Sequence, residues 1–465
     1  MASLRDALAT RAAVDTRALA ALRVGLGATM LVDLALRARS LRAFYTDAGV
    51  LPVGALREAF PAVSRLSLHA LSGGLAAQVA LFVAAGVAAV ALCIGYRTRL
   101  ALLVSWLLLV SLHARNPMVL NAGDSLLRRL MFWSLFLPLG ARWAADARED
   151  AQERVATVAS AALLGQVVVV YAVNAVLKLR GDAWLKGTAV GQVLALDQFT
   201  VFAGDALAGQ SALLAAATWG WLALVCAAPL LLLARPGRVR GAVAVAFALA
   251  HVGMALTLRL GIFPLVSLVA LLPFLPPSVW NAVDRRTVTL RARLADVGRP
   301  RPSALVPDRR VTRAALAALA AGLLVWNAAT LGLMPTPAPG ESLAPADNAW
   351  DMFAPEPPAV EGWLVAPSTT AAGDRVDAWV GGPLDRDRPP DLAAATPTAR
   401  WRKYLNDAWR ADGADAAHLA SYLCTRWERT RDATLERVAL FYVTGRPGAD
   451  VGDRTRERWG QWDCP

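Results

Sequence analysis

"VATVASAALLGQVVVVYAVNAVLKLRGDAW" occupies residues 155–184, and a lysine, an arginine, an aspartate and a tryptophan follow its long apolar run. The run 155–177 is about as long as the ~20 residues that a helix needs to cross a bilayer core. On a helix, Tyr171, Asn174 and Lys178 share one face, because they are three and then four residues apart. The stretch therefore predicts a membrane-spanning helix with a polar stripe near one end.

Lys178 allows two interpretations at this point. Its ammonium could extend from the helix end to the lipid headgroups, with Trp184 as an interfacial aromatic residue. Alternatively, the stripe could face a polar cavity that other helices share. Helix geometry alone leaves both open.

The composition of the whole chain places it in a membrane. Of its 465 residues, 56% are hydrophobic and only 18% are charged, and the mean hydropathy is +0.42. These values are too apolar for a soluble protein. The net charge of +12 comes from arginines that lie mostly between apolar runs, with no aromatic-interleaved basic stripe. We therefore expect the lipid bilayer as a partner and no nucleic acid.

Apolar runs recur along the chain and predict a polytopic transmembrane helical bundle of about nine spans, which makes the protein mainly α. The runs cover residues 18–36, 76–95, 100–114, 124–140, 155–177, 211–234, 241–258, 260–279 and 314–333. The third and fourth runs are short, so they form either full spans or a re-entrant pair.

Positive charge predicts the orientation of these spans. The densest arginine cluster, "DRRTVTLRARLADVGRPRPSALVPDRRVTR" at residues 284–313, should stay in the cytoplasm. We expect a multi-pass cell-membrane protein whose N-terminus is cytoplasmic and whose C-terminus is extracytoplasmic. The predicted parts are a transmembrane domain at 1–282, a basic cytoplasmic loop at 283–313, a last transmembrane helix at 314–333 and an extracytoplasmic domain at 334–465.

The C-terminal part begins with a proline-rich stretch, "MPTPAPGESLAPADNAWDMFAPEPP" at residues 334–358, which marks a boundary. "GWLVAPS" at 362–368 and "DRVDAWVGG" at 374–382 alternate apolar and polar residues and predict a strand pair. Residues 400–409 and 416–430 have the periodicity of amphipathic helices. We expect a small mixed α/β domain.

Cys424 and Cys464 both lie in this tail, in the compartment where disulfides persist, and we expect them to pair. Cys93 and Cys226 lie within spans and are expected to be apolar filler. The chain contains no CxxC and no Cys/His zinc spacing, so no metal is predicted.

A second group of polar residues gathers between the third and fourth runs, where burial in lipid would be costly unless they line a wet cavity. Its members are His113, Asn116, Asn121, Asp124 and Arg128. Asp124 and Arg128 are four residues apart and could instead neutralise one another along one helix face. For Asp33 and Arg37, with the same spacing, we expect such a structural pair.

Three stretches together resemble the HTTM family, the horizontally transferred transmembrane domain related to vitamin K-dependent gamma-carboxylase. They are "LHARNPMVLNAGDSLLRRLMFWSLFLPLGARW" at 112–143, "YAVNAVLKLRGDAWLKGTAVGQVLALDQFT" at 171–200 and "WDMFAPEPPAVEGW" at 350–363. They occur in the expected order. The last one contains the family motif residues Trp350, Met352, Phe353 and Pro355.

The resemblance implies a quinone-coupled, carboxylase-like lyase in which Lys178 is the base that deprotonates reduced vitamin K or menaquinone. A lysine can do this near neutral pH only if burial lowers its pKa well below about 10.4. The other expected pocket residues are Tyr171, Asn174, Asn121, Asp124, Arg128 and His113. With the resemblance added, we expect Lys178 to face a polar cavity rather than lipid.

This chain also departs from the carboxylases. They carry a histidine after paired asparagines in the segment that matches residues 121–127, where this chain has Asn121, Ala122, Gly123 and Asp124. The tail is also shorter than theirs. The alternative function is a non-catalytic membrane factor for maturation or export of a peptide or protein, which would then be a partner in place of a substrate.

Overall fold

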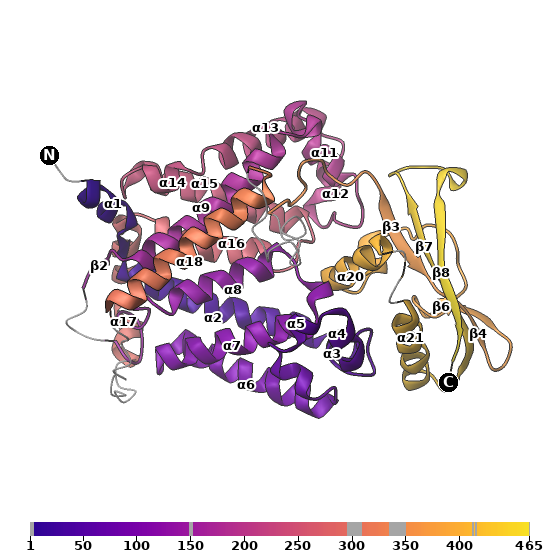
Figure 1. The fold of residues 1–465 in the computed structure, drawn as a ribbon. Helices are drawn as coiled ribbons and strands as arrows, with labels where there is room; N and C mark the ends of the chain where they lie inside the picture. The colour runs from indigo at the N-terminus through magenta and orange to yellow at the C-terminus, as the bar shows by residue number, and fades with distance from the viewer. Residues whose placement is uncertain are drawn as a thin grey trace.

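The computed structural model of the protein describes residues 4–147, 152–294, 309–333, 350–411, 413 and 416–464. A bundle of helices forms the larger part, and a β-sheet with two long helices forms the C-terminal part at one end of the bundle (Figure 1). The N-terminal helix lies at the opposite end of the bundle from the sheet (Figure 1). The protein is mainly helical, as predicted.

Within the described residues, six helices are long and apolar enough to cross a membrane. They are α2 (Thr16–Ala38), α6 (Leu75–Ile94), α7 (Thr98–Arg115), α9 (Val158–Lys178), α15 (Arg238–Thr257) and α18 (Arg309–Thr330). Each coincides with a predicted apolar run, and the membrane class of the protein is thereby supported.

The other three predicted runs form shorter or broken helices. They are α8 (Ala122–Ser134), the pair α13 (Ser211–Cys226) and α14 (Leu230–Leu233), and the series α16 (Phe263–Leu271), η3 (Leu272–Phe274) and α17 (Pro277–Leu294). Prolines explain the breaks, since Pro229, Pro273, Pro276 and Pro277 lack the backbone N–H that continues a helix. The chain bends by 103° before α17. The count of nine spans stays a prediction.

Short elements connect these helices. They are α1 (Leu4–Ala12), β1 (Val14–Asp15), α3 (Leu41–Tyr45), α4 (Val53–Ala59), α5 (Pro61–Ser64), η1 (Leu68–Leu71), η2 (Pro117–Val119), β2 (Arg154–Val155), α10 (Asp182–Leu185), α11 (Ala189–Leu194) and α12 (Ala203–Leu207). Helix α17 runs through the predicted boundary at residue 282. Residues 295–308 of the predicted basic loop and 334–349 of the proline-rich stretch lie outside the described residues.

The C-terminal sheet is antiparallel and is built around one long strand, β7 (Leu435–Gly445). One edge of β7 pairs with β8 (Thr455–Asp463), and the other pairs with β3 (Glu361–Val365) and β4 (Pro367–Thr370). The series continues through β5 (Arg375–Asp377) and β6 (Gly382–Pro383). The helical elements of this part are α19 (Leu392–Ala395), α20 (Ala399–Arg410), α21 (Ala416–Thr430) and η6 (Val451–Asp453).

The sequence predicted this part incompletely. The two amphipathic helices are present as α20 and α21, on the side of the sheet that faces the bundle (Figure 1). Of the predicted strand pair, β4 and β5 do pair around the turn, but residues 361–365 form β3 and pair with β7 instead. The hairpin of β7 and β8, the longest in the sheet, was not predicted.

A disulfide joins Cys424 in α21 to Cys464 after β8, as predicted, with 5.7 Å between the two Cα atoms. It ties a helix to the end of the unpredicted hairpin. The two cysteines expected in spans, Cys93 and Cys226, are free thiols.

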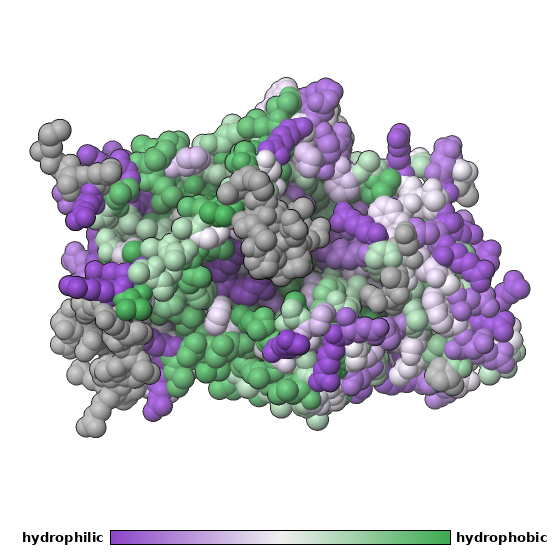
Figure 2. Space-filling view, viewed as in Figure 1, coloured by the Kyte–Doolittle hydropathy of each residue, from purple (hydrophilic) through white to green (hydrophobic). Residues whose placement is uncertain are grey.

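The surface divides in the same way as the fold. Figure 2 shows apolar residues over the helical bundle and polar residues over the sheet. On α6 the exposed side chains Val79, Val83, Val87, Val90 and Ile94 follow helical spacing. An apolar stripe of this kind on the outside of a bundle suits contact with lipid.

Candidate functional site

Lys178 is the last residue of α9, and its side chain turns into the protein. Nζ donates hydrogen bonds to the carbonyl oxygens of Met352 (2.9 Å) and Phe353 (3.4 Å). It also lies 3.4 Å from the centroid of the Trp184 ring. The side chain is only 1% exposed. The side chain of Lys178 therefore points away from the bundle surface, and the motif predicted at residues 350–355 covers it.

The motif makes further hydrogen bonds with α9 and with Trp184 just after it. Asn174 Nδ2 donates to the Trp350 carbonyl (2.9 Å), and Trp184 Nε1 donates to the Phe353 carbonyl (2.9 Å). Phe353 has a φ of 59°, a left-handed conformation that a bulky residue seldom adopts. Backbone strain of this kind often marks a functional segment. Here it accompanies a segment whose carbonyls converge on Lys178 and Trp184.

Tyr171, the third member of the stripe, belongs to a different neighbourhood. Its ring stacks on Phe247, with 4.1 Å between centroids, and lies 5.9 Å from His251 and 6.4 Å from Trp221. His251 also lies 5.7 Å from the Phe263 ring. The three residues that the sequence spacing places on one helix face therefore do not share one environment. Asn174 and Lys178 contact the motif, whereas Tyr171 belongs to an aromatic cluster.

The charge of Lys178 is unusual because, among the described residues, no carboxylate forms an ion pair with it. Asp351 is the acidic group whose charge acts on it. Burial raises the pKa of Asp351 above its ordinary value, against the attraction of Arg410, Lys403 and Lys178. The lysine thus has only neutral direct partners.

A second polar cluster combines two carboxylates and two guanidinium groups. Arg37 donates to Asp33 (Nε to Oδ2, 2.7 Å) and to Asp124 (Nη2 to Oδ1, 2.5 Å). Arg400 Nη2 donates to the same two residues, to Asp33 Oδ1 at 2.5 Å and to Asp124 Oδ1 at 2.9 Å. Tyr45 Oη also accepts from Arg37 (2.6 Å). We call these five residues the ion cluster.

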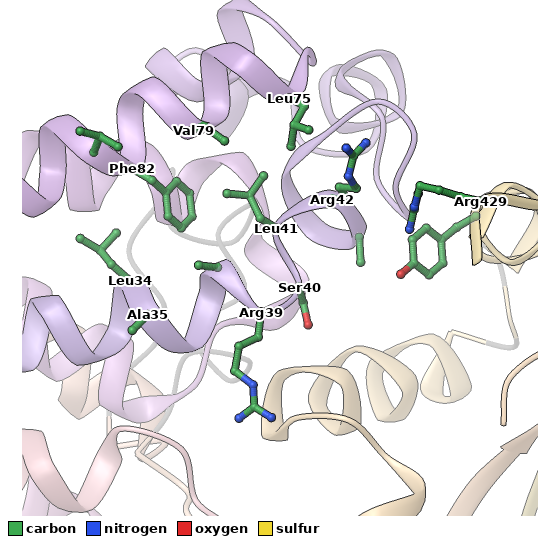
Figure 3. Close-up of a pocket in the computed structure, with 14 residues that line it drawn as sticks. Leu34, Ala35, Arg39, Ser40, Leu41, Arg42, Leu75, Val79, Phe82 and Arg429 are labelled. Atoms are coloured by element: carbon green, nitrogen blue, oxygen red, sulfur yellow. The ribbon is translucent and has the colours of Figure 1, made fainter. Parts of the chain in front are cut away.

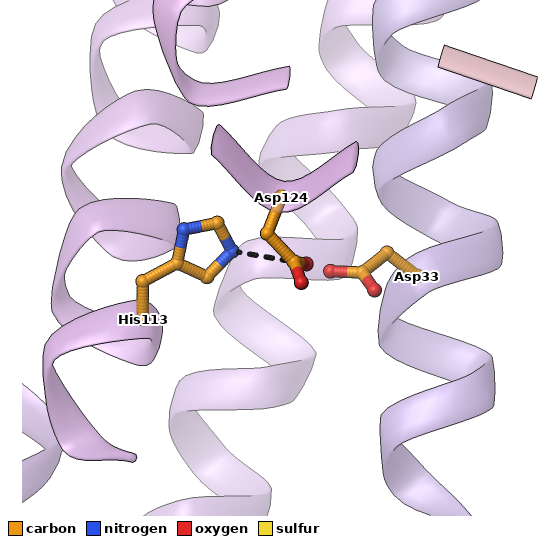
Figure 4. A group of neighbouring side chains, drawn as sticks. All are labelled: Asp33, His113 and Asp124. Carbon is orange, nitrogen blue, oxygen red and sulfur yellow. Dashed lines mark ion pairs between the residues drawn. The ribbon is translucent and has the colours of Figure 1, made fainter. Parts of the chain in front are cut away.

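His113 lies at the edge of the ion cluster. Figure 4 shows its imidazole beside the Asp124 carboxylate, with Asp33 on the other side. His113 Nε2 is 3.6 Å from Asp124 Oδ1, and Nδ1 is 3.4 Å from Arg128 Nη1. The predicted pair of Asp124 and Arg128 is replaced by contacts of Asp124 with Arg37 and Arg400, whereas Asp33 and Arg37 do pair as predicted.

Local sequence explains how Asp124 reaches this position. Asn121 caps α8 because its Oδ1 accepts from the backbone N–H of Asp124 (3.3 Å), and Asp124 Oδ2 accepts in return from the backbone N–H of Asn121 (2.8 Å). This reciprocal capping box fixes the first turn of the helix. Asn121 is therefore a helix cap here, and Asp124 serves both the cap and the ion cluster.

Arg400 was not predicted from the sequence. It lies in the first turn of α20, and 276 residues separate it from Asp124. Burial would lower the pKa of Arg400, but the attraction of Asp124 and Asp33 outweighs burial and holds it well above the ordinary value. The C-terminal part thus inserts one permanent cation between two carboxylates of the bundle.

Asp33, His113 and Asp124 offer three ligand atoms within 4.8 Å of one another. The donor set does not suit a metal ion, because both carboxylates already accept hydrogen bonds from two guanidinium groups. A cation placed there would face two positive neighbours at contact distance. The arrangement suits an ion network better.

Arg129 connects the two neighbourhoods. It follows Arg128 in α8, and its guanidinium carbon lies 4.8 Å from the centroid of the Trp350 ring. Helix α8 therefore contacts the ion cluster on one side and the family motif on the other. The predicted pocket residues thus fall into three groups: Asn174 and Lys178 on the motif, Tyr171 in the aromatic cluster, and the others in or beside the ion cluster.

These features define a membrane protein in which a C-terminal α/β part is fastened to a helical bundle at a buried lysine and at a buried ion cluster. The HTTM domain model matches residues 12–280, which is more than half of the chain, and the protein belongs to this family. Comparisons with curated proteins and with solved structures find no match. The matched range contains Lys178 and Asp124, whereas the motif and Arg400 lie beyond it.

Proposed function

We propose that this HTTM protein is a membrane enzyme of the carboxylase-like, quinone-coupled type, with Lys178 as its base. The observation that supports this most is the environment of Nζ, which is buried and has only neutral direct partners. A desolvated lysine of this kind can be an activated base. Because no carboxylate holds it in an ion pair, Lys178 is the side chain of the site best suited to accept a proton.

Two groups of residues support the binding of a quinone headgroup, namely the aromatic cluster around Tyr171, about two helical turns before Lys178 in α9, and Trp350 in the motif. The aromatic cluster of Tyr171, Trp221, Phe247, His251 and Phe263 offers ring faces for stacking. Trp350 Nε1 is buried without a hydrogen-bond partner within the described part of the chain, so it could donate to a quinone oxygen. A reduced quinone would supply an acidic hydroxyl when bound. Lys178 would take that proton at Nζ, while Trp184 and the Met352 carbonyl hold the amine in place.

The proposed enzyme has its N-terminus in the cytoplasm and its C-terminal part outside. The position of α1 and the sheet at opposite ends of the bundle supports this orientation (Figure 1). The arginine-rich residues 284–313 favour the cytoplasmic side for the end that carries α17. The motif and Lys178 would then lie near the outer surface.

The same contacts also favour a second role without chemistry. Two hydrogen bonds from Nζ go to the motif backbone, so Lys178 could simply fasten the C-terminal part. The protein would then be a membrane factor for maturation or export of a peptide. The two roles predict different behaviour for an arginine at this position.

The test uses full-length protein in nanodiscs and compares Lys178→Arg with Lys186→Arg. In a separate first step, a lipid extract of the purified protein is analysed for co-purified menaquinone. Arginine can donate to carbonyls but cannot release its proton near neutral pH. If Lys178 is the base, Lys178→Arg should slow the consumption of added reduced menaquinone by about 10²-fold or more. The thermal unfolding temperature should stay nearly unchanged. Lys186, an exposed residue paired with Asp182, is the control and should tolerate the change. Full turnover in Lys178→Arg would exclude the base and leave the fastening role.

A further inference from the structure

A groove of about 660 Å³ lies where the helical bundle meets the C-terminal part. Its lining comes from the end of α2, from α3, from the start of α6 and from α21 (Figure 3). One wall is apolar and includes Leu75, Val79, Phe82 and Val83. The groove contains none of the residues around Lys178 or of the ion cluster.

Three arginines, Arg39, Arg42 and Arg429, also line the groove, and its lining includes no carboxylate. All three are exposed, and none forms an ion pair within the described residues. Figure 3 shows Arg42 and Arg429 at one end of the groove and Arg39 near Ser40. Three like charges that share a groove repel one another, so an anion bound among them would be favourable.

The apolar wall continues onto the surface that suits lipid. Val79 is 44% exposed and Val83 is 59% exposed, and the same face of α6 continues to Val87 and Val90. A ligand with an acyl chain could therefore lie in the groove and along α6 without leaving an apolar surface. A small free anion would leave that wall unused.

We infer that the groove binds an anionic phospholipid of the leaflet nearest the sheet. Its phosphate is held by Arg42 and Arg429, which lie together at one end of the groove (Figure 3), since guanidinium groups bind phosphate oxygens in pairs of parallel hydrogen bonds. One acyl chain lies along Val79 and Val83. The bound lipid bridges the bundle and α21, because Arg429 belongs to the C-terminal part and Arg42 does not. This inference is independent of any catalytic role for Lys178.

The test is native mass spectrometry of the full-length protein in detergent, titrated with phosphatidylglycerol or with phosphatidylcholine of the same chain length. We expect phosphatidylglycerol to bind more tightly. Each arginine near an anionic lipid contributes about fivefold in affinity, so Arg42→Gln with Arg429→Gln should weaken phosphatidylglycerol binding about 25-fold. Phosphatidylcholine binding should be unchanged.

Arg65→Gln is the matched control, because Arg65 is exposed on the same end of the bundle but does not line the groove. It should leave both lipids unaffected. Thermal unfolding checks that the variants fold. If the double variant does not fold, Arg42→Gln alone replaces it. Equal affinity for the two lipids, or equal loss in Arg65→Gln, would overturn the inference. Displacement of the lipid by an equal concentration of glycerol phosphate would also overturn it, because a free anion would then be sufficient.

Discussion

Gly181 lies just after α9, where the backbone of the motif packs closely against the chain. A Cβ atom built at this position would lie 1.8 Å from the carbonyl oxygen of Pro355. That obstacle is backbone, so it cannot move aside as a flexible side chain would. Glycine at 181 thus permits the approach that brings the motif carbonyls to Lys178.

Gly181→Ala should displace the motif and leave Lys178 and Asn174 with unsatisfied donors. An unsatisfied buried donor costs about 1–3 kcal/mol, so the free energy of unfolding should fall by at least about that amount. Gly165→Ala, within α9, is the control, since a Cβ there meets nothing within 4 Å. It should be neutral or slightly stabilising. Thermal unfolding in detergent measures both, and equal effects would contradict the close contact.

His69 lies in η1, outside the spans, and its Nδ1 is 2.6 Å from Ser111 Oγ. Burial, together with the charges of Arg115 and Arg37, lowers the pKa of His69 from 6.5 to about 4. The imidazole is therefore neutral in the folded protein at pH 5 but charged in the unfolded chain. Its contribution to stability is present above about pH 6.5 and is lost as the pH falls toward 4.

His69→Gln should reduce the loss of stability on acidification. The difference in the free energy of unfolding between the native protein and the variant should change by up to about 3 kcal/mol between pH 7 and pH 4. Thermal unfolding across this pH range in detergent gives that difference. A variant with the same pH dependence as the native protein would show that another group titrates.

At the scale of elements, α20 fastens the C-terminal part to α2 and α8 through the ion cluster. Arg400 is the only residue of the ion cluster that comes from outside the bundle. Buried ion pairs give little net stability compared with apolar packing, yet removing one partner leaves a buried charge unbalanced. The ion cluster therefore specifies how the two parts meet more than it stabilises either part.

Arg400→Met should lower the free energy of unfolding by about 3–5 kcal/mol, because Asp33 and Asp124 would then share one arginine. Lys403→Met, in the same helix, removes a partly exposed pair with Asp407 and should cost about 1 kcal/mol or less. Adding Asp33→Asn to Arg400→Met should recover part of the loss, since it removes the unbalanced charge. Additive losses in the double variant would argue against coupling.

Periodicity explains which elements could be predicted. The apolar runs that became α2, α6, α7, α9, α15 and α18 carry their signal within about 20 residues, and α20 and α21 show an apolar face at helical spacing. The motif contacts of Lys178 could not be predicted, because they are made to backbone carbonyls. The contact of Arg400 with Asp124 depends on packing across 276 residues. The prolines in the runs 211–234 and 260–279 are visible in the sequence, but the prediction treats each run as one continuous span.

For the whole molecule, the proposed orientation in the membrane decides on which side Lys178 and the C-terminal part lie. Six straight candidate spans are an even number, whereas α1 and the sheet lie at opposite ends of the bundle (Figure 1). The proposed orientation puts these two ends on opposite faces of the membrane and so needs an odd number of crossings. It therefore requires that one of the shorter or broken helices, α8, α13 or α16, contributes a crossing.

Alkaline phosphatase fusions test the orientation. A fusion after Pro465 should be active, because the proposed orientation places the C-terminal part outside the cytoplasm. A fusion at Gly298, within the arginine-rich loop, should be inactive. The opposite pattern would invert the proposed arrangement and move Lys178 to the cytoplasmic surface.

The ion cluster also sets an order for biosynthesis. The ribosome completes α2, α7 and α8 long before residue 400 emerges, so the newly inserted bundle contains Asp33 and Asp124 with only Arg37 in contact with both. The second arginine arrives only when the C-terminal part has folded against the bundle. A chain that terminates early therefore keeps an uncompensated carboxylate inside the bundle, a defect that membrane quality-control proteases could recognise before the protein is finished.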